Sequence, residues 1–94
     1  MPRPRGRRRI GFPHGQKFFK PAGVPLSVLQ TVSLSHEEAE ALRLKHVLNL
    51  SQTESAREMN TSQSTFQRIL STAHAKISTA LVQNQAIAIE DSAE

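Results

Sequence analysis

Residues 50–70 read LSQTESAREMNTSQSTFQRIL and carry the clearest structural signals of the chain. Ser51 and Glu54 have the spacing of a capping box, in which a serine and a glutamate satisfy free amide groups at a helix start. Ala56 is small enough to let a second helix cross closely, and Asn60 tolerates the left-handed backbone of a tight turn. The stretch therefore predicts two helices joined by a turn, a helix-turn-helix, with the first helix over residues 51–59.

The second helix of this unit is predicted over residues 63–82. Ser62 has the residue type of an N-cap. Apolar residues recur behind it at helical spacing and define the expected buried stripe: Phe66, Ile69, Ala73, Ile77 and Leu81. The opposite side carries amides, hydroxyls and one arginine, and no acidic residue occurs between Glu58 and Glu90.

The rest of the domain is predicted to support this unit. A second capping box, Ser35 with Glu38, opens a helix over residues 36–48 whose apolar residues surround most of its circumference, so it should be largely enclosed. Residues 10–27 contain many proline and glycine residues and predict an ordered loop. Residues 30–34 and 86–90 both have the pattern of a short strand. They form a small β ribbon within the chain or, alternatively, the second segment is a dimer interface. The predicted class is mainly α, with an arm at 1–20, a domain at 21–90 and a tail at 91–94.

Charge is distributed unevenly along the chain. The first 20 residues carry seven basic residues and no acidic one, whereas residues 21–94 carry five basic and eight acidic residues. The attraction to a polyanion is therefore concentrated in the arm. Pro4-Arg5-Gly6-Arg7 is similar to the centre of an AT-hook, in which Arg-Gly-Arg lies along a narrow minor groove, but the usual proline after the second arginine is missing. A tail that contacts phosphates without sequence preference is the alternative.

The polar face and the arm together predict contacts with double-stranded DNA. Glutamine pairs with adenine and arginine with guanine in the major groove, and serine contacts either bases or phosphates. The residues expected to contact bases are Gln63, Ser64, Gln67, Arg68 and Ser71. The residues expected at phosphates or in the minor groove are Arg3, Arg5, Gly6, Arg7, Arg8, Arg9, Lys17, Lys20, Ser62 and Thr65.

Several other classes of function are not expected. The chain has no cysteine, no run of about 20 apolar residues that would span a membrane, and no visible nucleophile–base pair, so neither a membrane protein nor an enzyme is predicted. His14, His36, Glu40 and His46 lack the spacing of a metal site, so no metal and no cofactor are expected. The predicted location is the cytoplasm, in association with the nucleoid.

The chain resembles the UPF0251 family of small prokaryotic proteins, also called DUF134. The stretches that carry the resemblance include Met1-Pro-Arg-Pro-Arg5, Phe19-Lys-Pro-Ala-Gly-Val-Pro-Leu26, Glu40-Ala-Leu-Arg-Leu44 and Ser64-Thr-Phe66. The resemblance implies a helix-turn-helix similar to region 4 of sigma-70 factors and a DNA-binding role with no established target. Relatives usually have glycine where Asn60 stands, a departure that the backbone tolerates.

The leading hypothesis is a sequence-specific DNA-binding transcriptional regulator. In this reading helix 63–74 enters the major groove and the arm follows phosphates or a minor groove. Two alternatives stay open: a protein-interaction module that docks on RNA polymerase or another regulator, and an RNA-binding accessory protein. A homodimer also stays open, because helix-turn-helix proteins often double their contacts by symmetry.

Overall fold

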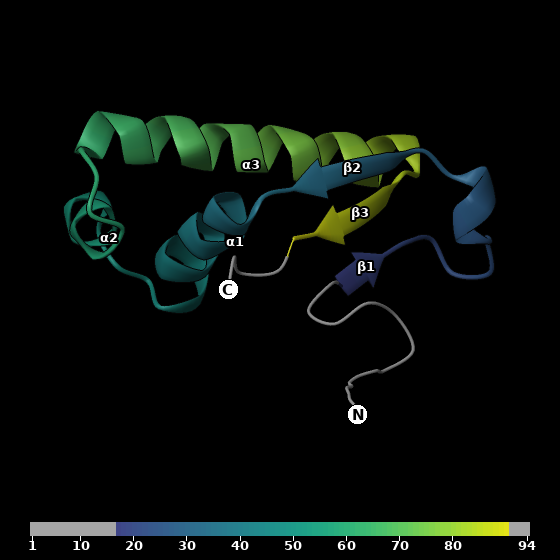
Figure 1. Ribbon diagram of the computed structural model, residues 1–94, viewed down its shortest axis with the longest axis horizontal. Helices are drawn as coiled ribbons and strands as arrows, with labels where there is room; N and C mark the ends of the chain where they lie inside the picture. Colours follow the sequence, from purple (N-terminus) through teal and green to yellow (C-terminus); the bar gives the residue numbers. More distant parts are fainter. Residues whose placement is uncertain (1–16, 91–94) are drawn as a thin grey trace, which may run out of the picture.

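The structure, a computed structural model, describes residues 17–90 and is mainly helical with a small sheet (Figure 1). Its elements in chain order are β1 (Lys17–Phe19), η1 (Leu26–Val28), β2 (Thr31–Leu34), α1 (His36–Leu42), η2 (Arg43–Val47), α2 (Gln52–Glu58), α3 (Gln63–Gln83) and β3 (Ala86–Ile89). The mainly α class is confirmed, and each of the three α-helices begins within one residue of the predicted position.

Serine begins each α-helix. The hydroxyl of Ser35 accepts a hydrogen bond from the amide of Glu38, and that of Ser51 accepts one from the amide of Glu54, each over 3.1 Å. In both cases the glutamate carboxylate accepts the serine amide in return, so the two predicted capping boxes are formed. Ser62 caps α3 through its hydroxyl as well. These local hydrogen bonds explain why the helix starts could be predicted from sequence alone.

A left-handed asparagine follows η2, α2 and α3. Asn49, Asn60 and Asn84 have φ angles of 57°, 55° and 57°. Asparagine enters this region more readily than other residues with a Cβ atom, and a left-handed residue stops a helix while its amide satisfies a free carbonyl. The amide of Asn84, for example, donates to the carbonyl of Ala80.

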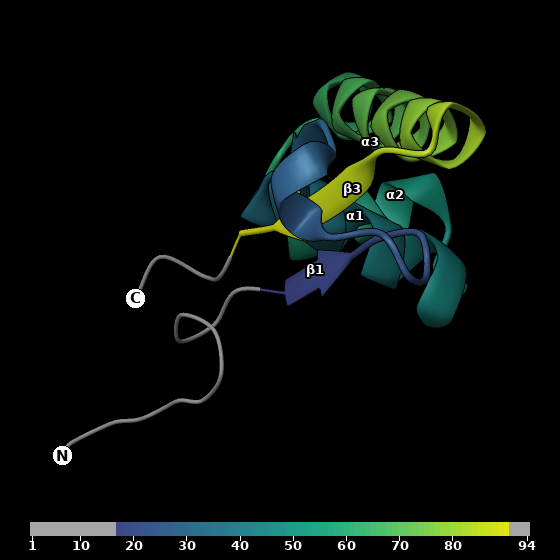
Figure 2. The ribbon, with the colours of Figure 1, turned by 90° about the vertical axis from the view of Figure 1, so that its right-hand side faces the viewer.

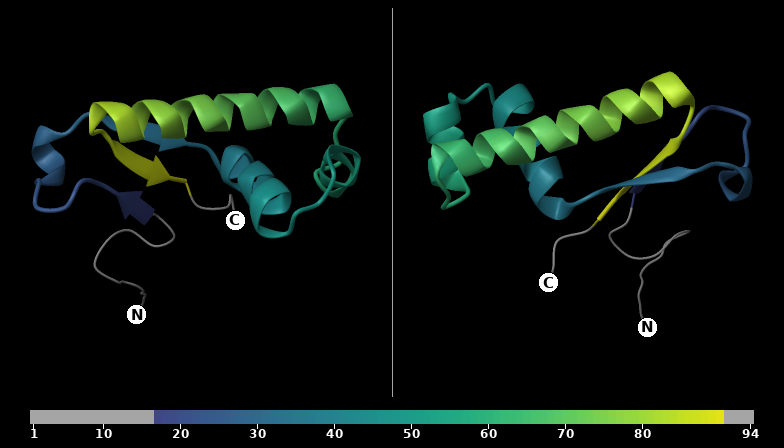
Figure 3. Two further views of the ribbon diagram at one scale, coloured as in Figure 1. Left: turned by 180° about the vertical axis from the view of Figure 1, so that it is seen from behind. Right: turned by 90° about the horizontal axis from the view of Figure 1, so that it is seen from above.

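The other elements all pack against one side of α3 (Figure 1). Below its first turns lies α2, below its middle lies α1, and below its last turns lie the strands. In the view from above, β2 and β3 lie to one side of the last turns of α3 (Figure 3), and the view from its C-terminal end shows the same one-sided arrangement (Figure 2). The opposite side of α3 is left uncovered by the described elements along its whole length.

The core lies where the three helices meet. Ala41 of α1, Ala56 of α2, and Phe66 and Leu70 of α3 form one buried cluster, with Phe66 and Ala41 completely inaccessible to solvent. The small Ala56 thus has the predicted role at the helix crossing. The predicted stripe of α3 is wrong at its end, because Leu81 is 71% exposed and Ala80 is buried instead. A helix repeats every 3.6 residues, so steps of four drift off the buried side.

The helix that begins at His36 changes its winding before it ends. Residues Arg43–Val47 form a π-helical turn, closed by a hydrogen bond from the amide of Leu48 to the carbonyl of Arg43 over 3.0 Å. Ala41 and Leu44 are buried, but Val47 is 71% and Leu48 49% exposed, so the predicted enclosure is wrong for the end of this helix. The wider π turn moves later residues away from the positions that α-helical spacing gives them.

The sheet has the strand order β1-β3-β2. β3 pairs parallel to β2, with Val32 opposite Ile87, and antiparallel to β1, with Phe18 opposite Ala88. The predicted ribbon therefore forms within the chain, and β3 has neighbours on both edges, which leaves neither edge for pairing with a second chain. The strand β1 was not predicted: it lies in residues assigned to the arm and to an ordered loop. Three residues are too few to show an alternating pattern.

Candidate nucleic-acid interface

The turn between α2 and α3 is held by backbone hydrogen bonds. The amide of Asn60 donates to the carbonyl of Arg57 over 3.1 Å, and the amide of Thr61 donates to that of Ala56 over 3.0 Å. With Asn60 in the left-handed region, these bonds stop α2 and direct the chain into α3. The path of this turn therefore fixes the orientation of the first turns of α3 relative to α2.

The start of α3 is organised by its hydroxyl groups. The Ser62 Oγ accepts the amide of Thr65 over 3.1 Å and donates to the Thr65 Oγ1 over 2.9 Å. It also lies 3.3 Å from the Oγ of Ser64. Ser62 and Ser64 are exposed and Thr65 is partly buried. Because a helix has no internal acceptors for its first amide groups, the amides of Gln63 and Ser64 face outward where an anion would be stabilised.

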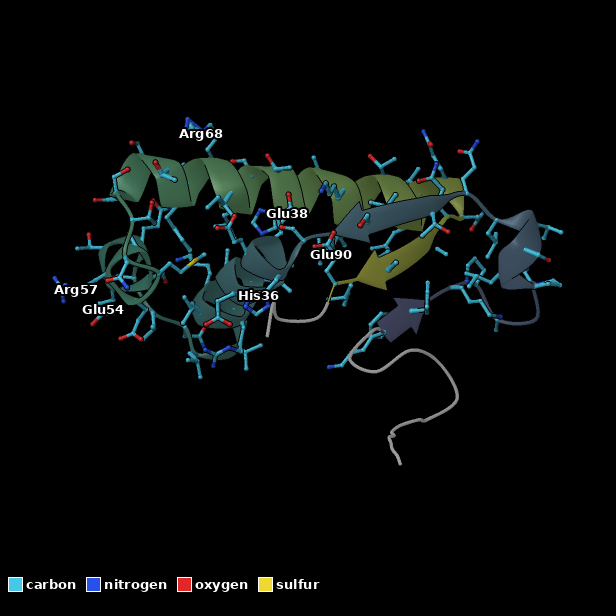
Figure 4. The ribbon with its side chains drawn as sticks, viewed as in Figure 1. His36, Glu38, Glu54, Arg57, Arg68 and Glu90 are labelled. Carbon is cyan, nitrogen blue, oxygen red and sulfur yellow. The ribbon has the colours of Figure 1, made fainter. Side chains whose placement is uncertain are left out.

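The five residues predicted to contact bases are all exposed. Ser64, Gln67, Arg68 and Ser71 follow the spacing i, i+3, i+4, i+7, which places them on one face of α3. The side chain of Arg68 points away from α1, α2 and the sheet (Figure 4). Gln63 differs, because its Oε1 accepts a hydrogen bond from the Thr53 Oγ1 of α2 over 3.3 Å. The structure therefore brings four of the five predicted residues together and turns the fifth toward α2.

Arg68 and Lys76 are the two permanent cations of α3, and their surroundings differ. The Lys76 Nζ donates to the Glu38 Oε1 and to the carbonyl of Ser33, both over 2.8 Å, so it binds α3 to α1 and β2. Within residues 17–90 Arg68 forms no ion pair. Lys76 therefore stabilises the packing of α3, whereas the charge of Arg68 lies on the uncovered face of the helix.

Three carboxylates have lowered pKa values. Burial raises the pKa of Glu38, but hydrogen bonds from Lys76 and Ser35, together with the charge of Lys76, lower it more. The Arg43 guanidinium donates to both oxygens of Glu40, over 2.7 and 3.0 Å, and lowers its pKa. The amide and hydroxyl of Ser51 lower the pKa of Glu54, a solvent-exposed residue. All three carboxylates are held by local partners in their charged form.

The two lysines predicted for the phosphate-contacting set do not share the face of α3. Lys17 lies on β1, and the views of Figures 1 and 2 both place β1 and the uncovered side of α3 at opposite ends of the molecule. The Lys20 Nζ donates to the carbonyl of Val24 over 2.7 Å and closes the following loop. The other predicted members of the arm, Arg3, Arg5, Gly6, Arg7, Arg8 and Arg9, lie outside the described residues.

Two exposed residues of α2 were not among those predicted. Thr53 contacts Gln63, and Arg57 is exposed at the outer end of α2 (Figure 4). In known helix-turn-helix proteins the first helix crosses the nucleic-acid backbone. Arg57 could have been recognised from its place in the last turn before Asn60.

The described chain shows no arrangement typical of metal clusters or membrane spans. No three His, Asp or Glu residues of 17–90 lie close enough together to hold a metal ion. None of the helices in this range combines the length and apolar character that crossing a membrane requires.

Comparison with known proteins gives a family and no solved structure. The model of the family described as "Protein of unknown function DUF134" matches residues 1–93. A UPF0251 protein of Dehalococcoides mccartyi is 52% identical over 90 residues, which cover 96% of this chain and 77% of the relative. A UPF0251 protein of Halothermothrix orenii is 44% identical over 90 residues, covering 96% of this chain and 67% of the relative. One of Moorella thermoacetica is 48% identical over 90 residues, covering 96% and 60%. No solved structure matches the chain.

Proposed function

The chain belongs to the DUF134 family of proteins of unknown function, and we propose that it is a sequence-specific double-stranded DNA-binding protein that regulates transcription. The first turns of α3 enter the major groove, and the arginine arm contacts phosphates or an adjacent minor groove. On this proposal the protein acts at the nucleoid without a cofactor and catalyses no reaction.

The observation that carries the proposal is the uncovered face at the start of α3. Ser64, Gln67, Arg68 and Ser71 are exposed together on a helix that contains no acidic residue. The opposite side is fixed in the core by Phe66 and Leu70. A polar helix face that protrudes from a supporting core is what major-groove binding requires, and amide, guanidinium and hydroxyl groups are the ones that read base edges.

The finer part of the proposal is a three-helix unit similar to region 4 of sigma-70 factors. Its support is the common core of Ala41, Ala56 and Phe66, which joins α1, α2 and α3 in the order that a supporting helix, a first helix and a recognition helix have. The sheet and the last turns of α3, which pack against each other, lie outside this three-helix unit.

Affinity and specificity come from different parts of the chain in this proposal. The described residues 17–90 contain seven basic and six acidic residues, so the body itself attracts a polyanion weakly. The five arginines of residues 1–9 supply the charge. A segment of 16 residues spans at most about 55 Å when extended, and this is the reach of the arm from β1, which lies opposite the uncovered side of α3.

Selection of bound sequences from random duplexes at a stated salt concentration tests the proposal. The wild-type chain should enrich a common sequence, and Arg68→Ala should change the preference at one base pair by about 1–3 kcal/mol. Arg43→Ala is the matched control, because it removes the same charge from η2, where Arg43 is paired with Glu40. It should leave the selected sequence unchanged.

The two alternative functions are distinguished by the same material. Recovery of the chain with RNA polymerase, without any shift of duplex DNA, would replace the proposal with a protein-docking role. Stronger competition by double-stranded RNA than by duplex DNA would replace it with a role on RNA. If no sequence is enriched, the chain does not bind DNA sequence-specifically. If Arg68→Ala and Arg43→Ala select the same sequence, Arg68 of α3 does not read a base.

A further inference from the structure

Two exposed histidines from different elements meet at the surface. His46 of η2 and His74 of α3 are 28 residues apart in sequence, and their Nε2 atoms lie 2.8 Å from each other. The ring centroids are 5.1 Å apart and the rings are tilted by 48°. Each ring is accessible to solvent. His74 stands three residues after Ser71 on α3, so this second polar feature borders the face that is proposed to contact DNA.

The backbone holds both histidines in place while their rings stay accessible. His46 lies in the π-helical turn, and such single turns are frequent at functional sites. His74 follows the buried Ala73 and stands two residues before Lys76, whose bonds to Glu38 and Ser33 fix this part of α3. The distance between the two rings is thus set by the packing of the supporting helix against α3.

The spacing of the two nitrogens fits a shared metal ion. Zinc–imidazole bonds are about 2.0–2.1 Å long, so two Nε2 atoms on one ion are about 2.9 Å apart at a bond angle of 90° and about 3.3 Å apart at the tetrahedral angle. The observed 2.8 Å is close to the first value and reaches the second by a small rotation of exposed side chains. Imidazole nitrogen suits Zn²⁺, Ni²⁺ and Cu²⁺, whereas Mg²⁺ and Ca²⁺ prefer oxygen ligands.

Two cations near the pair in the chain are engaged by carboxylates, whereas Lys45, adjacent to His46, forms no ion pair within residues 17–90. His46 lies at the rim of a groove of about 480 Å³ whose other lining residues are apolar apart from Arg43. The Arg43 guanidinium is engaged by the Glu40 carboxylate at 2.7 Å, which offsets its positive charge. Lys76, the cation of α3 nearest to His74 in sequence, is engaged by Glu38 in the same way.

We propose that His46 and His74 form a binding site for one late first-row divalent ion, of the class of Zn²⁺, Ni²⁺ or Cu²⁺, with water completing the coordination. In the neutral pair the N–H group at one Nε2 donates a hydrogen bond to the other Nε2. When the ion binds, that proton moves to the Nδ1 of its own ring, so both Nε2 lone pairs face the ion and the pair releases no proton. The ion then joins η2 directly to α3 and restricts the movement of the supporting helix against the proposed recognition helix. The site does not depend on the proposed function.

Zinc titration of the full chain without an affinity tag, followed by the ¹⁵N chemical shifts of the histidine rings, tests the proposal. We expect the Nε2 signals of His46 and His74 to shift together and to saturate at one Zn²⁺ per chain, while those of His36 stay unchanged. Because binding to the folded state alone stabilises it, the unfolding midpoint should rise by roughly 5 °C or more at a tenfold excess over Kd.

Calorimetric titration of single variants provides the second measurement. His46→Asn and His74→Asn should each weaken Zn²⁺ binding by about tenfold or more, since one imidazole alone is a weak ligand. His36→Asn, which removes an exposed histidine outside the pair, should bind as the wild type does. Both rings are exposed, so the variants should fold, which circular dichroism checks. Unchanged ring signals at saturating Zn²⁺, independent shifts of the two rings, or full affinity in His74→Asn would overturn the proposal.

Discussion

The two halves of α3 differ in what they expose and in how they are held. In the first half, residues 63–71, Phe66 and Leu70 are buried against α1 and α2, and the outer side presents hydroxyls, amides and an arginine. In the second half, residues 72–83, Lys76 bonds to α1 and β2, and the outer side ends with Leu81 and Val82, 71% and 81% exposed. The first half offers groups that could read bases, and the second is bound into the sheet.

The contrast between the two halves shows how a small domain can leave one face of a helix exposed. A helix of two or three turns is not stable alone, so a protruding face must be carried by tertiary contacts elsewhere. Extending α3 over the sheet supplies those contacts without covering the first turns. We call the contacts of Lys76 with Glu38 and Ser33 the anchor. Substitutions at the anchor should alter stability, and substitutions on the outer face of the first half should alter DNA binding.

The largest effect is expected at Phe66, the side chain through which the first half of α3 packs into the core. Phe66 is fully buried among Ala41, Ala56 and Leu70. Phe66→Ala should lower the free energy of unfolding by about 3–5 kcal/mol, because it removes a large apolar contact and leaves a cavity. Urea denaturation followed by circular dichroism measures this. A loss below about 1 kcal/mol would show that the three helices do not share this core.

Removing the anchor should lower the unfolding free energy less than Phe66→Ala does. It should leave the outer face of the first half of α3 unchanged. Lys76→Met keeps the apolar stem but removes the donor to Glu38 and Ser33, leaving the mostly buried carboxylate of Glu38 without its cation. We expect a loss of about 1–3 kcal/mol in unfolding free energy. The sequence selected from random duplexes should not change. A shifted base preference in this variant would contradict the separation of the two halves.

The anchor should also be visible in the dependence of stability on pH. The pKa of Glu38 is lowered from the ordinary value of 4.5 in the folded state. A lowered carboxylate pKa contributes stability above the unfolded value, and this contribution is lost as pH falls from about 4.5 through the folded pKa. Glu38→Gln should flatten the decrease of unfolding free energy below pH 5, with the residual slope due to other carboxylates such as Glu40 and Glu54. An unaltered slope would exclude the Glu38–Lys76 pair as a source of acid sensitivity.

The smallest effect compares two equivalent serines. Ser71 and Ser78 are seven residues apart, so they lie on nearly the same face of α3, and both are exposed. Ser71→Ala should weaken binding to the selected duplex by about 0.5–1.5 kcal/mol through one lost hydrogen bond, and Ser78→Ala should have no effect. Fluorescence anisotropy at fixed salt measures both. Equal effects, or the larger effect at Ser78, would place the contact surface elsewhere on α3.

What could be predicted from the sequence is what depends on neighbouring residues. The serine caps, the left-handed Asn60 and the small Ala56 follow from spacings of a few residues, and the structure confirms them. β1 was missed because three residues carry no alternation and their partner, β3, lies near the other end of the chain. The burial of Ala80 in place of Leu81 depends on the exact rotation of a long helix, which steps of three and four residues define poorly.

The candidate site was predictable in its chemistry and less so in its geometry. The exposure of Gln63, Ser64, Gln67, Arg68 and Ser71 follows from the helical period. The turn of Gln63 toward Thr53 and the position of Lys17 away from α3 depend on how helices and strands pack. The His46–His74 pair is a contact between segments 28 residues apart, so no local spacing could have indicated it.

The salt dependence of duplex DNA binding tests the central claim most directly. Affinity is proposed to come from the arm and specificity from α3. The logarithm of the binding constant should therefore fall against the logarithm of salt concentration with a slope near −5 to −6 from the arm. Deleting residues 1–9, with their five arginines, should reduce the magnitude of the slope by about 4–5 and preserve the selected sequence. A slope near zero for the intact chain would contradict the account.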